Sequence, residues 1–501
     1  MRNSNLINQE LGMFSYKDPE LWTDENIYDE TQAPWFYHIN NLLDLNKEDL
    51  INIKNIIDND KKRGVIYNSI LDVIDFQTYY GIMRKINSNM NNVLSVYLFS
   101  CKYFLKKYSK EPDTDGRVKF VFIFGNNTSD LDSVCSSIIY SFFLYIWYNL
   151  KGKIDKKSED NALMFFVPVI NIKRSNMRLK ILEKWWLEKC EIKNPEEILV
   201  FNDNEHLLDV LKYDHKYYIC LVDFNTFEAN NIYNGGNVKS IIDHHVYKGK
   251  GENNKITKSI YPICVCSCMV IIAYLYKHSS DFLGVAFVNK SILWLMYGAI
   301  LKDSNNFIKH DLGKRWIQSD LDIFLSLKNN FKISNKMDIY ITYLFNTIRF
   351  SIDLKTFGIE NVLFSDYKDY NYFVCGKKIK IRMSSIDFSI DFLFSHENSS
   401  QLVEKMYNLC YENDFSMFIL IGSYLNNYKL QKDLSIVFYK NDVDRNDLMN
   451  TLLVNEEIKL SKKGYKIIRF GDNIQNFDIY KINNLSYSRK RLENFLTIYF
   501  S

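Results

Sequence analysis

The chain has 501 residues, more than one hydrophobic core usually fills, so we expect two domains. Hydrophobic residues make up 47% and charged residues 25% of the chain, a composition that excludes a disordered or fibrous protein. The formal net charge is only +3, so overall charge does not predict a nucleic-acid partner, and a polyanion would need a local basic cluster.

Cysteines and apolar runs indicate a cytoplasmic protein. The chain has nine cysteines and no evident secretory leader, which favours reduced thiols. The tightest group, "CVCSC" at 264–268, lacks the C-x2-C pairing of structural zinc, so we expect buried thiols there. The longest apolar run, 134–150, is short for a bilayer span and contains three serines, which predicts a buried helix and no membrane contact.

In chain order, the first 110 residues predict an N-terminal helical extension that ends in a helix over 93–108. A turn-rich stretch follows, and then strands alternate with helices. The apolar strands are predicted at 118–125, 163–172, 217–224 and 238–245. This pattern predicts an α/β domain over 111–325, with a parallel sheet flanked by helices.

The rest of the chain predicts a second domain. A helical linker is expected over 326–348, followed by a smaller α/β C-terminal domain over 349–501. We expect this domain to close an inter-domain cleft that holds the substrate.

Polar residues follow the predicted strands of the first domain. The first strand runs into "GNNTSDLDS", the third ends at Asp223, and the fourth ends at Asp243, His244 and His245. An apolar helical segment delivers one more acid, Asp303. Each aspartate alone could be a cap or turn residue, but ligands of parallel sheets bind at the carboxyl ends of strands. Together these residues indicate a site.

The residue types predict a metal centre. Carboxylates with one imidazole suit two Mg²⁺ or Mn²⁺ ions better than a thiolate zinc site. Asp130 and Asp132 are two residues apart, so a loop can direct them at different ions, and Asp223 could bridge the two. Two such ions clamp an attacking water and a phosphoryl oxygen, which is the chemistry of phosphoryl hydrolysis.

The segments "GNNTSDLDS", "LVDF", "DHH" and "ILKDS", in this order, resemble the four motifs of the DHH phosphoesterase superfamily. "FVPVINIKRSNMRLK" and "VCSC" resemble segments of its exopolyphosphatases and family II pyrophosphatases. "LFSDYKDY", "KIRMSSIDFSIDFL" and "SYSRKRLENFL" resemble the associated C-terminal domain. The resemblance covers about residues 115 to 500 and implies a metal-dependent exopolyphosphatase that releases orthophosphate from inorganic polyphosphate.

The resemblance also implies roles in the metal centre. One ion would be held by Asn126, Asp130 and Asp223, and the other by Asp132, Asp223, His244 and Asp303. His245 matches the substrate-contacting histidine of the family and is the candidate general acid. Asp243 is expected to orient an imidazole from behind.

In the C-terminal domain the resemblance implies a phosphate grip. Ser488, Arg489 and Lys490 match the "SRK" of the family, and Lys368 extends this predicted substrate-binding surface. Basic residues at strand and turn positions are more often simply solvated, and we favour that interpretation for Lys368, Lys380 and Arg382.

Departures from the family narrow the prediction. Asn126 stands where family II pyrophosphatases have histidine, whereas exopolyphosphatases and prune proteins read "GN". Prune proteins generally read D-H-R where this chain keeps "DHH", so the combination favours exopolyphosphatase. A neutral amide should shift metal preference toward harder ions such as Mg²⁺. Phe224, Cys266 and Ser304 replace the more common His, Gly and Thr without removing a predicted ligand.

Other functions stay open. Inorganic pyrophosphatase is the nearest alternative, with polyphosphate or pyrophosphate as the substrate. A nuclease or cyclic-dinucleotide phosphodiesterase is less favoured because the chain lacks their C-terminal "GGGH" segment. A non-catalytic scaffold that binds polyphosphate or a protein is the third alternative, motivated by Asn126, Phe224 and the long N-terminal extension. The oligomeric state is not indicated.

Overall fold

The computed structural model describes residues 47–67, 69–86, 92–110, 118–154, 163–225, 232, 237–245, 258–260, 265–286, 288–349, 358–363, 366–374, 376–396, 399–426, 429–470, 473–485 and 487–500. The chain divides into two compact units, with the boundary between Leu344 and Phe345, inside a helix that begins in the N-terminal unit.

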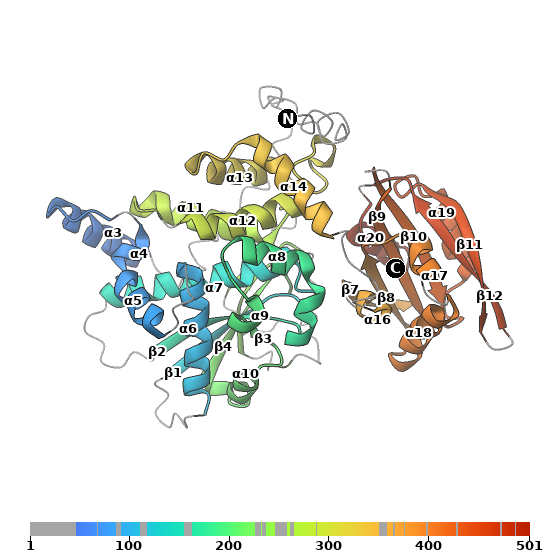
Figure 1. The fold of residues 1–501 in the computed structure, drawn as a ribbon, viewed down its shortest axis with the longest axis horizontal. Coiled ribbons are helices and arrows are strands. Elements are labelled where there is room, and N and C mark those ends of the chain that lie inside the picture. The colour runs from blue at the N-terminus through green and yellow to red at the C-terminus, as the bar shows by residue number, and fades with distance from the viewer. Residues whose placement is uncertain are drawn as a thin grey trace. The chain divides into compact units, whose positions relative to one another are not determined.

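The N-terminal unit contains a parallel sheet of six strands in the order β3-β2-β1-β4-β5-β6 (Figure 1). The strands are β1 (Val118–Phe124), β2 (Leu163–Ile170), β3 (Val200–Phe201), β4 (Tyr217–Val222), β5 (Val238–Ile242) and β6 (Lys258–Ile260). Each pairs in parallel with its neighbours, which confirms the predicted parallel sheet. The order reverses beside β1, so β1 and β4 form the centre where a parallel sheet usually binds its ligand.

Helices cover this sheet. Those of the unit are α3 (Lys47–Lys62), α4 (Ile70–Val73), α5 (Phe76–Ile86), α6 (Val93–Tyr108), α7 (Leu131–Ile154), α8 (Ile181–Lys189), α9 (Pro195–Ile198), α10 (Glu205–Val210), α11 (Cys268–Leu283), α12 (Lys290–Asp303), α13 (Gln318–Asn330) and α14 (Asn335–Arg349), with short 3-10 helices at Arg174–Leu179, Asp214–Lys216 and Lys309–Asp311. α7 packs along β1 and β2, and α11 and α12 pack on α7. Leu131–Leu150 is long and apolar enough to cross a membrane, but 83% of its most apolar stretch is buried, as expected of a core helix.

α6 has the predicted bounds and packs directly against β2. β3 pairs only with Val169 and Ile170, so the earlier part of β2 lies beyond the reach of that strand. There the carbonyl of Phe166 accepts hydrogen bonds from Tyr97 Oη at 2.6 Å and from Cys101 Sγ at 3.2 Å. Side chains of α6 thus satisfy a backbone acceptor that a longer β3 would have satisfied.

The C-terminal unit contains a mixed sheet in the order β11-β12-β10-β9-β8-β7. Its strands are β7 (Tyr367–Val374), β8 (Lys377–Ile386), β9 (Met417–Asn426), β10 (Lys429–Phe438), β11 (Leu460–Phe470) and β12 (Asn473–Ile482). β8 and β9 are parallel, and the other neighbours are antiparallel. Its helices are α16 (Ile359–Leu363), α17 (Ile390–His396), α18 (Ser399–Glu412), α19 (Arg445–Val454) and α20 (Arg489–Tyr499). Two hydrophobic clusters build its core.

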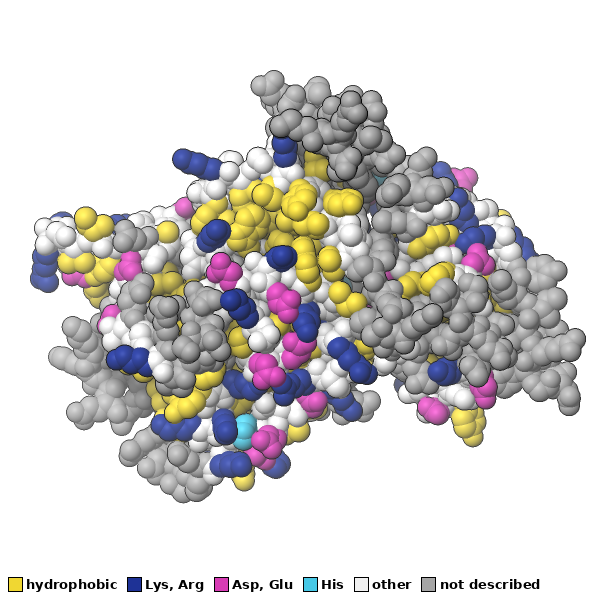
Figure 2. All heavy atoms as spheres, viewed as in Figure 1, with side chains coloured by type: hydrophobic (Ala, Val, Ile, Leu, Met, Phe, Trp, Pro, Cys, Tyr) yellow, Lys and Arg dark blue, Asp and Glu magenta, His cyan; other side chains and the backbone are white. Residues whose placement is uncertain are grey.

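Lysine and arginine side chains are interspersed with acidic ones over the face of the N-terminal unit drawn in Figure 2. This mixing agrees with the small net charge of the chain.

Candidate metal centre

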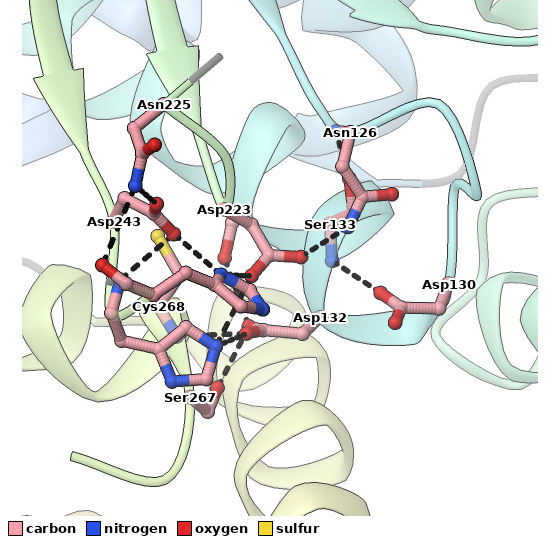
Figure 3. A network of polar contacts seen from close by, with 12 residues as sticks. Asn126, Asp130, Asp132, Ser133, Asp223, Asn225, Asp243, Ser267 and Cys268 are labelled. Atoms are coloured by element: carbon pink, nitrogen blue, oxygen red, sulfur yellow. Dashed lines mark hydrogen bonds and ion pairs between the residues drawn. The ribbon is translucent and has the colours of Figure 1, made fainter. Parts of the chain in front are cut away.

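The predicted polar residues meet at one edge of the parallel sheet (Figure 3). Asp223 directly follows β4, and Asp243 directly follows the neighbouring strand β5. Asn126 comes two residues after the end of β1, which lies on the other side of β4. Adjacent parallel strands therefore bring together residues that are distant in the sequence, as the strand-end pattern predicted.

Asp223 occupies a strained backbone position. Its φ is 62°, in the left-handed region, where a short polar side chain is among the few tolerated besides glycine. Its amide nitrogen still donates to the carbonyl of Ile242 at 2.9 Å, so the turn begins only after the strand ladder ends. The buried carboxylate accepts from Asn126 Nδ2 at 2.7 Å through Oδ2, and its Oδ1 lies 3.3 Å from His244 Nε2.

His244 is buried and held from behind. Its Nδ1 lies 2.9 Å from the carbonyl oxygen of Val265, which can only accept, so Nδ1 carries the proton. Nε2 then has the lone pair, and it points toward Asp223 Oδ1 at 3.3 Å and Asp132 Oδ2 at 4.0 Å. A lone pair directed at two carboxylates is the arrangement that a divalent cation completes, and a backbone acceptor behind a metal-binding histidine is usual.

His245 has a different environment although it is the next residue. Its Nδ1 bonds to Asp243 Oδ1 at 2.7 Å, so Nε2 is the nitrogen turned away from Asp243. The side chain of His245 is 27% exposed, against 10% for that of His244. His245 is therefore the more exposed of the two, although its Nδ1 also lies 3.8 Å from Asp223 Oδ1.

Asp243 is fully buried and accepts hydrogen bonds from both His244 and His245. Its carboxylate accepts from the backbone nitrogen of His244 at 2.8 Å, from His245 Nδ1, and from Asn225 Nδ2 at 2.5 Å. Burial alone would raise the pKa of Asp243, but the hydrogen bond and positive charge of His245 outweigh burial and lower this pKa below its ordinary value. Asp243 is therefore ionised at neutral pH and fixes the orientation of His245.

The two aspartates of "SDLD" lie at the start of α7. Asp130 precedes the helix and caps it, accepting from the backbone nitrogen of Ser133 at 3.1 Å. Asp132 lies within the first turn, and burial raises its pKa. The Asp132 carboxylate accepts four hydrogen bonds: from Ser136 Oγ at 3.1 Å, Ser267 Oγ at 2.7 Å, and the backbone nitrogens of Cys268 and Met269 at 2.7 and 3.0 Å. It thus also caps α11.

Asn126 turns its amide oxygen toward its own loop. Oδ1 accepts from Thr128 N at 3.0 Å, Thr128 Oγ1 at 2.7 Å and Ser129 N at 2.9 Å, which identifies it as the oxygen. The amide nitrogen donates to Asp223. In this conformation Asn126 supports the carboxylate of Asp223, and its role as a metal ligand stays a prediction.

Asp303 ends α12 and approaches the same carboxylates. Burial raises its pKa to about 7; the charge of Lys302 opposes this rise, and the charges of Asp132 and Asp130 add to it. The next residues make a tight left-handed turn, with φ of 55°, 56° and 52° at Asn305, Asn306 and Phe307. Carboxylates that raise one another's pKa are stabilised when a cation binds between them.

The donor set fits a divalent cation. The nearest ligand atoms of Asp223, His244 and His245 lie within 4.8 Å of one another. Hard carboxylate oxygens and a neutral imidazole with a fixed tautomer are ligands that Mg²⁺ and Mn²⁺ accept. Cys266 and Cys268 are buried, and burial raises the pKa of both thiols well above the ordinary value, so both are protonated in the metal-free protein. Cys264 lies outside the described residues.

The sequence pattern did not identify Asp320. This residue lies in α13 and is fully buried, and burial raises its pKa to about 7. Its Oδ2 accepts from the backbone nitrogen of Cys266 at 2.9 Å and from that of Ile317 at 3.0 Å. An aspartate in the first turn of a helix indicates only a cap, so no sequence signal connects it with Cys266.

The predicted phosphate grip lies in the C-terminal unit. Ser488 precedes α20, and Lys490 lies in its first turn. Arg489 forms an ion pair with Asp366 at 2.8 Å, two residues before the half-buried Lys368. Of these residues, Arg489 therefore already has a carboxylate partner.

Arg382 is not the solvated residue that the sequence led us to expect. It is 5% exposed, and two nitrogens of its guanidinium bond to the two Asp369 carboxylate oxygens, each at 2.7 Å. The guanidinium carbon also lies 4.2 Å from the ring centre of Tyr367 and 4.7 Å from that of Phe415. Arg382 is thus a structural residue of this unit.

Comparisons with known proteins agree with this geometry. Residues 120–300 match the N-terminal domain of the DHH family, and residues 349–497 match the DHHA2 domain. A provisionally named exopolyphosphatase of Schizosaccharomyces pombe is 30% identical over 196 residues, which are 37% of this chain and 45% of that protein. Exopolyphosphatase PRUNE1 of Homo sapiens is 31% identical over 128 residues, 26% of this chain and 25% of that protein.

A solved structure of a provisionally named family II inorganic pyrophosphatase from Methanococcus jannaschii has a TM-score of 0.47 and 15% identity, covering 76% of this chain and 99% of that one. The chain spans less than half the length of the curated relatives described above. The two domain matches follow one another in the order that the motifs predicted, and each lies on one sheet-containing part of the molecule. The chain therefore contains a DHH-family N-terminal domain over residues 120–300, followed by a DHHA2 domain over residues 349–497.

Proposed function

We propose that the chain is a metal-dependent hydrolase of phosphoanhydride bonds, and that it acts as an exopolyphosphatase on inorganic polyphosphate. The observation that carries the proposal is the division of roles between adjacent histidines. His244 directs Nε2 at Asp223, whereas His245 is held at Nδ1 by Asp243. The DHH and DHHA2 matches and the names of the relatives support the same reaction class.

We assign two divalent cations, Mg²⁺ or Mn²⁺, to the carboxylate cluster. Asp223, His244, Asp132 and Asp303 are the proposed ligands, with Asp130 and Asn126 as further candidates. Bound there, the ions would lower the pKa of a water molecule and stabilise charge on the phosphoryl oxygens. Without cations, buried carboxylates this close together raise one another's pKa, which is the physical reason for expecting tight binding.

His245 is the proposed general acid. Because Asp243 is ionised and accepts from Nδ1, it stabilises the protonated imidazole and keeps Nε2 turned outward. Nε2 can then donate its proton to the oxygen of the departing phosphate, which would otherwise leave as a poor, highly charged group.

We propose that the DHHA2 domain grips the polyphosphate chain through Ser488, Lys490, Arg489 and Lys368. Arg489 would share its charge between Asp366 and the substrate, and Lys490 and Lys368 would add point charges beside it. We also propose that the protein is located in the cytoplasm.

The test is phosphate release from pyrophosphate, tripolyphosphate, long polyphosphate and ATP, measured side by side with Mg²⁺ or Mn²⁺. We expect release from tripolyphosphate and longer chains to exceed release from pyrophosphate. Activity on pyrophosphate alone would identify a pyrophosphatase, the nearest alternative. Absence of release from every substrate with each metal would contradict the proposal and favour a scaffold.

A further inference from the structure

One short segment, Val265–Met269, contacts two of the proposed metal ligands. Its first residue supplies the carbonyl oxygen that accepts from His244 Nδ1 at 2.9 Å. Its last three residues supply Ser267 Oγ and two backbone nitrogens to the carboxylate of Asp132, at 2.7 to 3.0 Å. The position of this segment therefore sets both the tautomer of His244 and the direction of Asp132.

The middle of the segment is held by Asp320. The backbone nitrogen of Cys266 donates to Asp320 Oδ2 at 2.9 Å, and both residues are buried. Asp320 comes from α13, a helix beyond residues 120–300 that match the DHH domain. Above its pKa of about 7 the Asp320 carboxylate is charged, and a charged acceptor makes a stronger hydrogen bond than a neutral one, so this contact then fixes the segment firmly.

We propose that Asp320 is a positioning residue of the metal centre, acting through the backbone of Cys266 on His244 and Asp132. The inference rests on the proposed function, since it concerns the same metal ligands. Loss of the carboxylate would leave the buried nitrogen of Cys266 without its acceptor, and the segment would shift away from His244 and Asp132. Residues that orient metal ligands typically change metal affinity by about 10- to 100-fold when they are replaced.

A competing interpretation is that Asp320 only caps α13. Its Oδ2 also accepts from the backbone nitrogen of Ile317 at 3.0 Å, which is an ordinary contact at the start of a helix. A cap alone would affect the stability of α13 and leave the metal affinity of the folded protein unchanged. The two interpretations therefore predict different metal affinities for folded variants of Asp320.

The experiment compares the Mn²⁺ dissociation constant of the full chain, by calorimetry, with those of Asp320→Ala, Asp320→Asn and Asp322→Asn. Asp322 lies on the same helix, is exposed, and accepts only from Gln318 Nε2 among the described contacts, so it is the matched control. We expect about 10- to 100-fold weaker binding for Asp320→Ala. Asp320→Asn keeps an oxygen for both backbone donors, so only a few-fold loss is expected, and none for Asp322→Asn.

A second measurement is the activity of Asp320→Ala at a raised Mn²⁺ concentration. A positioning defect should be rescued by excess metal, whereas a loss of folded protein should not. Folded Asp320→Ala that binds Mn²⁺ as tightly as the wild type would overturn the inference, as would equal losses for Asp320→Ala and Asp320→Asn.

If Asp320→Ala does not fold, hydrogen exchange of the metal-free Asp320→Asn chain decides. We expect faster exchange over 265–269, because a neutral acceptor holds the Cys266 amide less tightly, and unchanged exchange there would overturn the inference. This reading needs neither bound metal nor substrate. Failure of the proposed function would be recognised separately, as a wild-type chain that releases no phosphate from any substrate.

Discussion

The aspartates of the candidate metal centre have different partners from the paired aspartates of the C-terminal unit. In the metal centre, the carboxylates of Asp132, Asp223 and Asp243 lie beside the imidazoles of His244 and His245. In the C-terminal unit the partners of aspartates are lysines and arginines. These pairs are Asp433 with Lys463, Asp369 with Arg382, and Asp366 with Arg489. Elsewhere in the N-terminal unit the buried Asp338 pairs with Lys328, as aspartates of the C-terminal unit do. Only the second kind of partner is charged at every physiological pH.

The difference separates a structural arrangement from a binding one. A carboxylate paired with lysine or arginine is neutralised within the fold, so it has little need of a further cation. A cluster whose partners are imidazoles gains its positive charge only by taking up protons or a metal. The candidate metal centre therefore has an electrostatic demand that the lysine- and arginine-paired aspartates lack.

Replacing Asp223, the central carboxylate of the candidate metal centre, should have the largest effect of the variants described below. We expect Asp223→Asn to lower the rate of phosphate release on the order of 1,000-fold, because a neutral amide cannot bridge two cations. Asparagine tolerates the left-handed backbone at this position, so the fold should persist. Initial rates on tripolyphosphate and the circular dichroism spectrum check both points. Asp322→Asn is the exposed control, and a variant that keeps a tenth of the activity would refute the assignment.

His245→Gln should have the next largest effect. We expect about a 100-fold lower kcat with little change in Mn²⁺ affinity, because His245 is assigned to proton transfer and His244 to the metal. The pH profile of kcat should also lose one of its limbs. His215→Gln changes an exposed histidine and should behave as the wild type. A large loss of Mn²⁺ affinity in His245→Gln would show that the two histidines share one role.

In the C-terminal unit, Lys463→Met should affect stability and leave metal binding intact. Lys463 Nζ lies 2.9 Å from Asp433, whose side chain is 0% exposed, so its removal leaves a buried charge and should cost about 3 kcal/mol in urea unfolding at pH 7. Lys462 is 57% exposed and its partner Asp478 is 20% exposed, so Lys462→Met should change the unfolding free energy less. A large loss of Mn²⁺ affinity in Lys463→Met would contradict the separation of the units.

The contribution of the Lys463–Asp433 pair to the free energy of unfolding should depend on pH. Burial alone would lower the pKa of Lys463, but hydrogen bonds to Asp391, Tyr424 and Asp433 outweigh it and raise the pKa. A raised pKa in the folded state stabilises the protein below the pKa of the unfolded lysine, about 10.4, and this contribution disappears as pH rises through the folded value. The stability difference between wild type and Lys463→Met should therefore narrow above pH 10.4, and a constant difference would argue against the charge as its cause.

Arg382→Met should have the smallest effect of the series. Its partner Asp369 is 40% exposed and can be hydrated when the arginine is lost, so we expect about 1 kcal/mol, mainly from the lost contacts with Tyr367 and Phe415. Urea unfolding beside Lys463→Met measures the contrast. An equal or larger loss than that of Lys463→Met would show that exposure of the carboxylate does not determine the cost.

The sequence predicted the long elements of the parallel sheet and overlooked the short ones. Apolar runs marked β1, β2, β4 and β5, with the predicted ends one to three residues too late because polar site residues follow directly. β3 and β6 have two and three residues, too few for a hydrophobic pattern to be visible. The predicted helix over 93–108 is confirmed because its apolar face repeats over four turns.

The candidate site was predictable where its residues follow strands. The order of Asp223, Asp243, His244 and His245 along adjacent strand ends was enough to place them together. Contacts made by backbone groups, such as the carbonyl of Val265 behind His244, have no signature in residue types. Asp320 was missed for the same reason, since its partner is an amide nitrogen.

The contact between α6 and β2 bears on aggregation. An uncovered strand edge can pair with another chain, and β3 is too short to cover β2 along its length. Tyr97 and Cys101 occupy the Phe166 carbonyl and so block one of the positions where a foreign strand would attach. We therefore expect a shortened chain that begins at β1 to expose this edge and to associate with other chains more readily, because the helix that precedes the DHH domain would be missing.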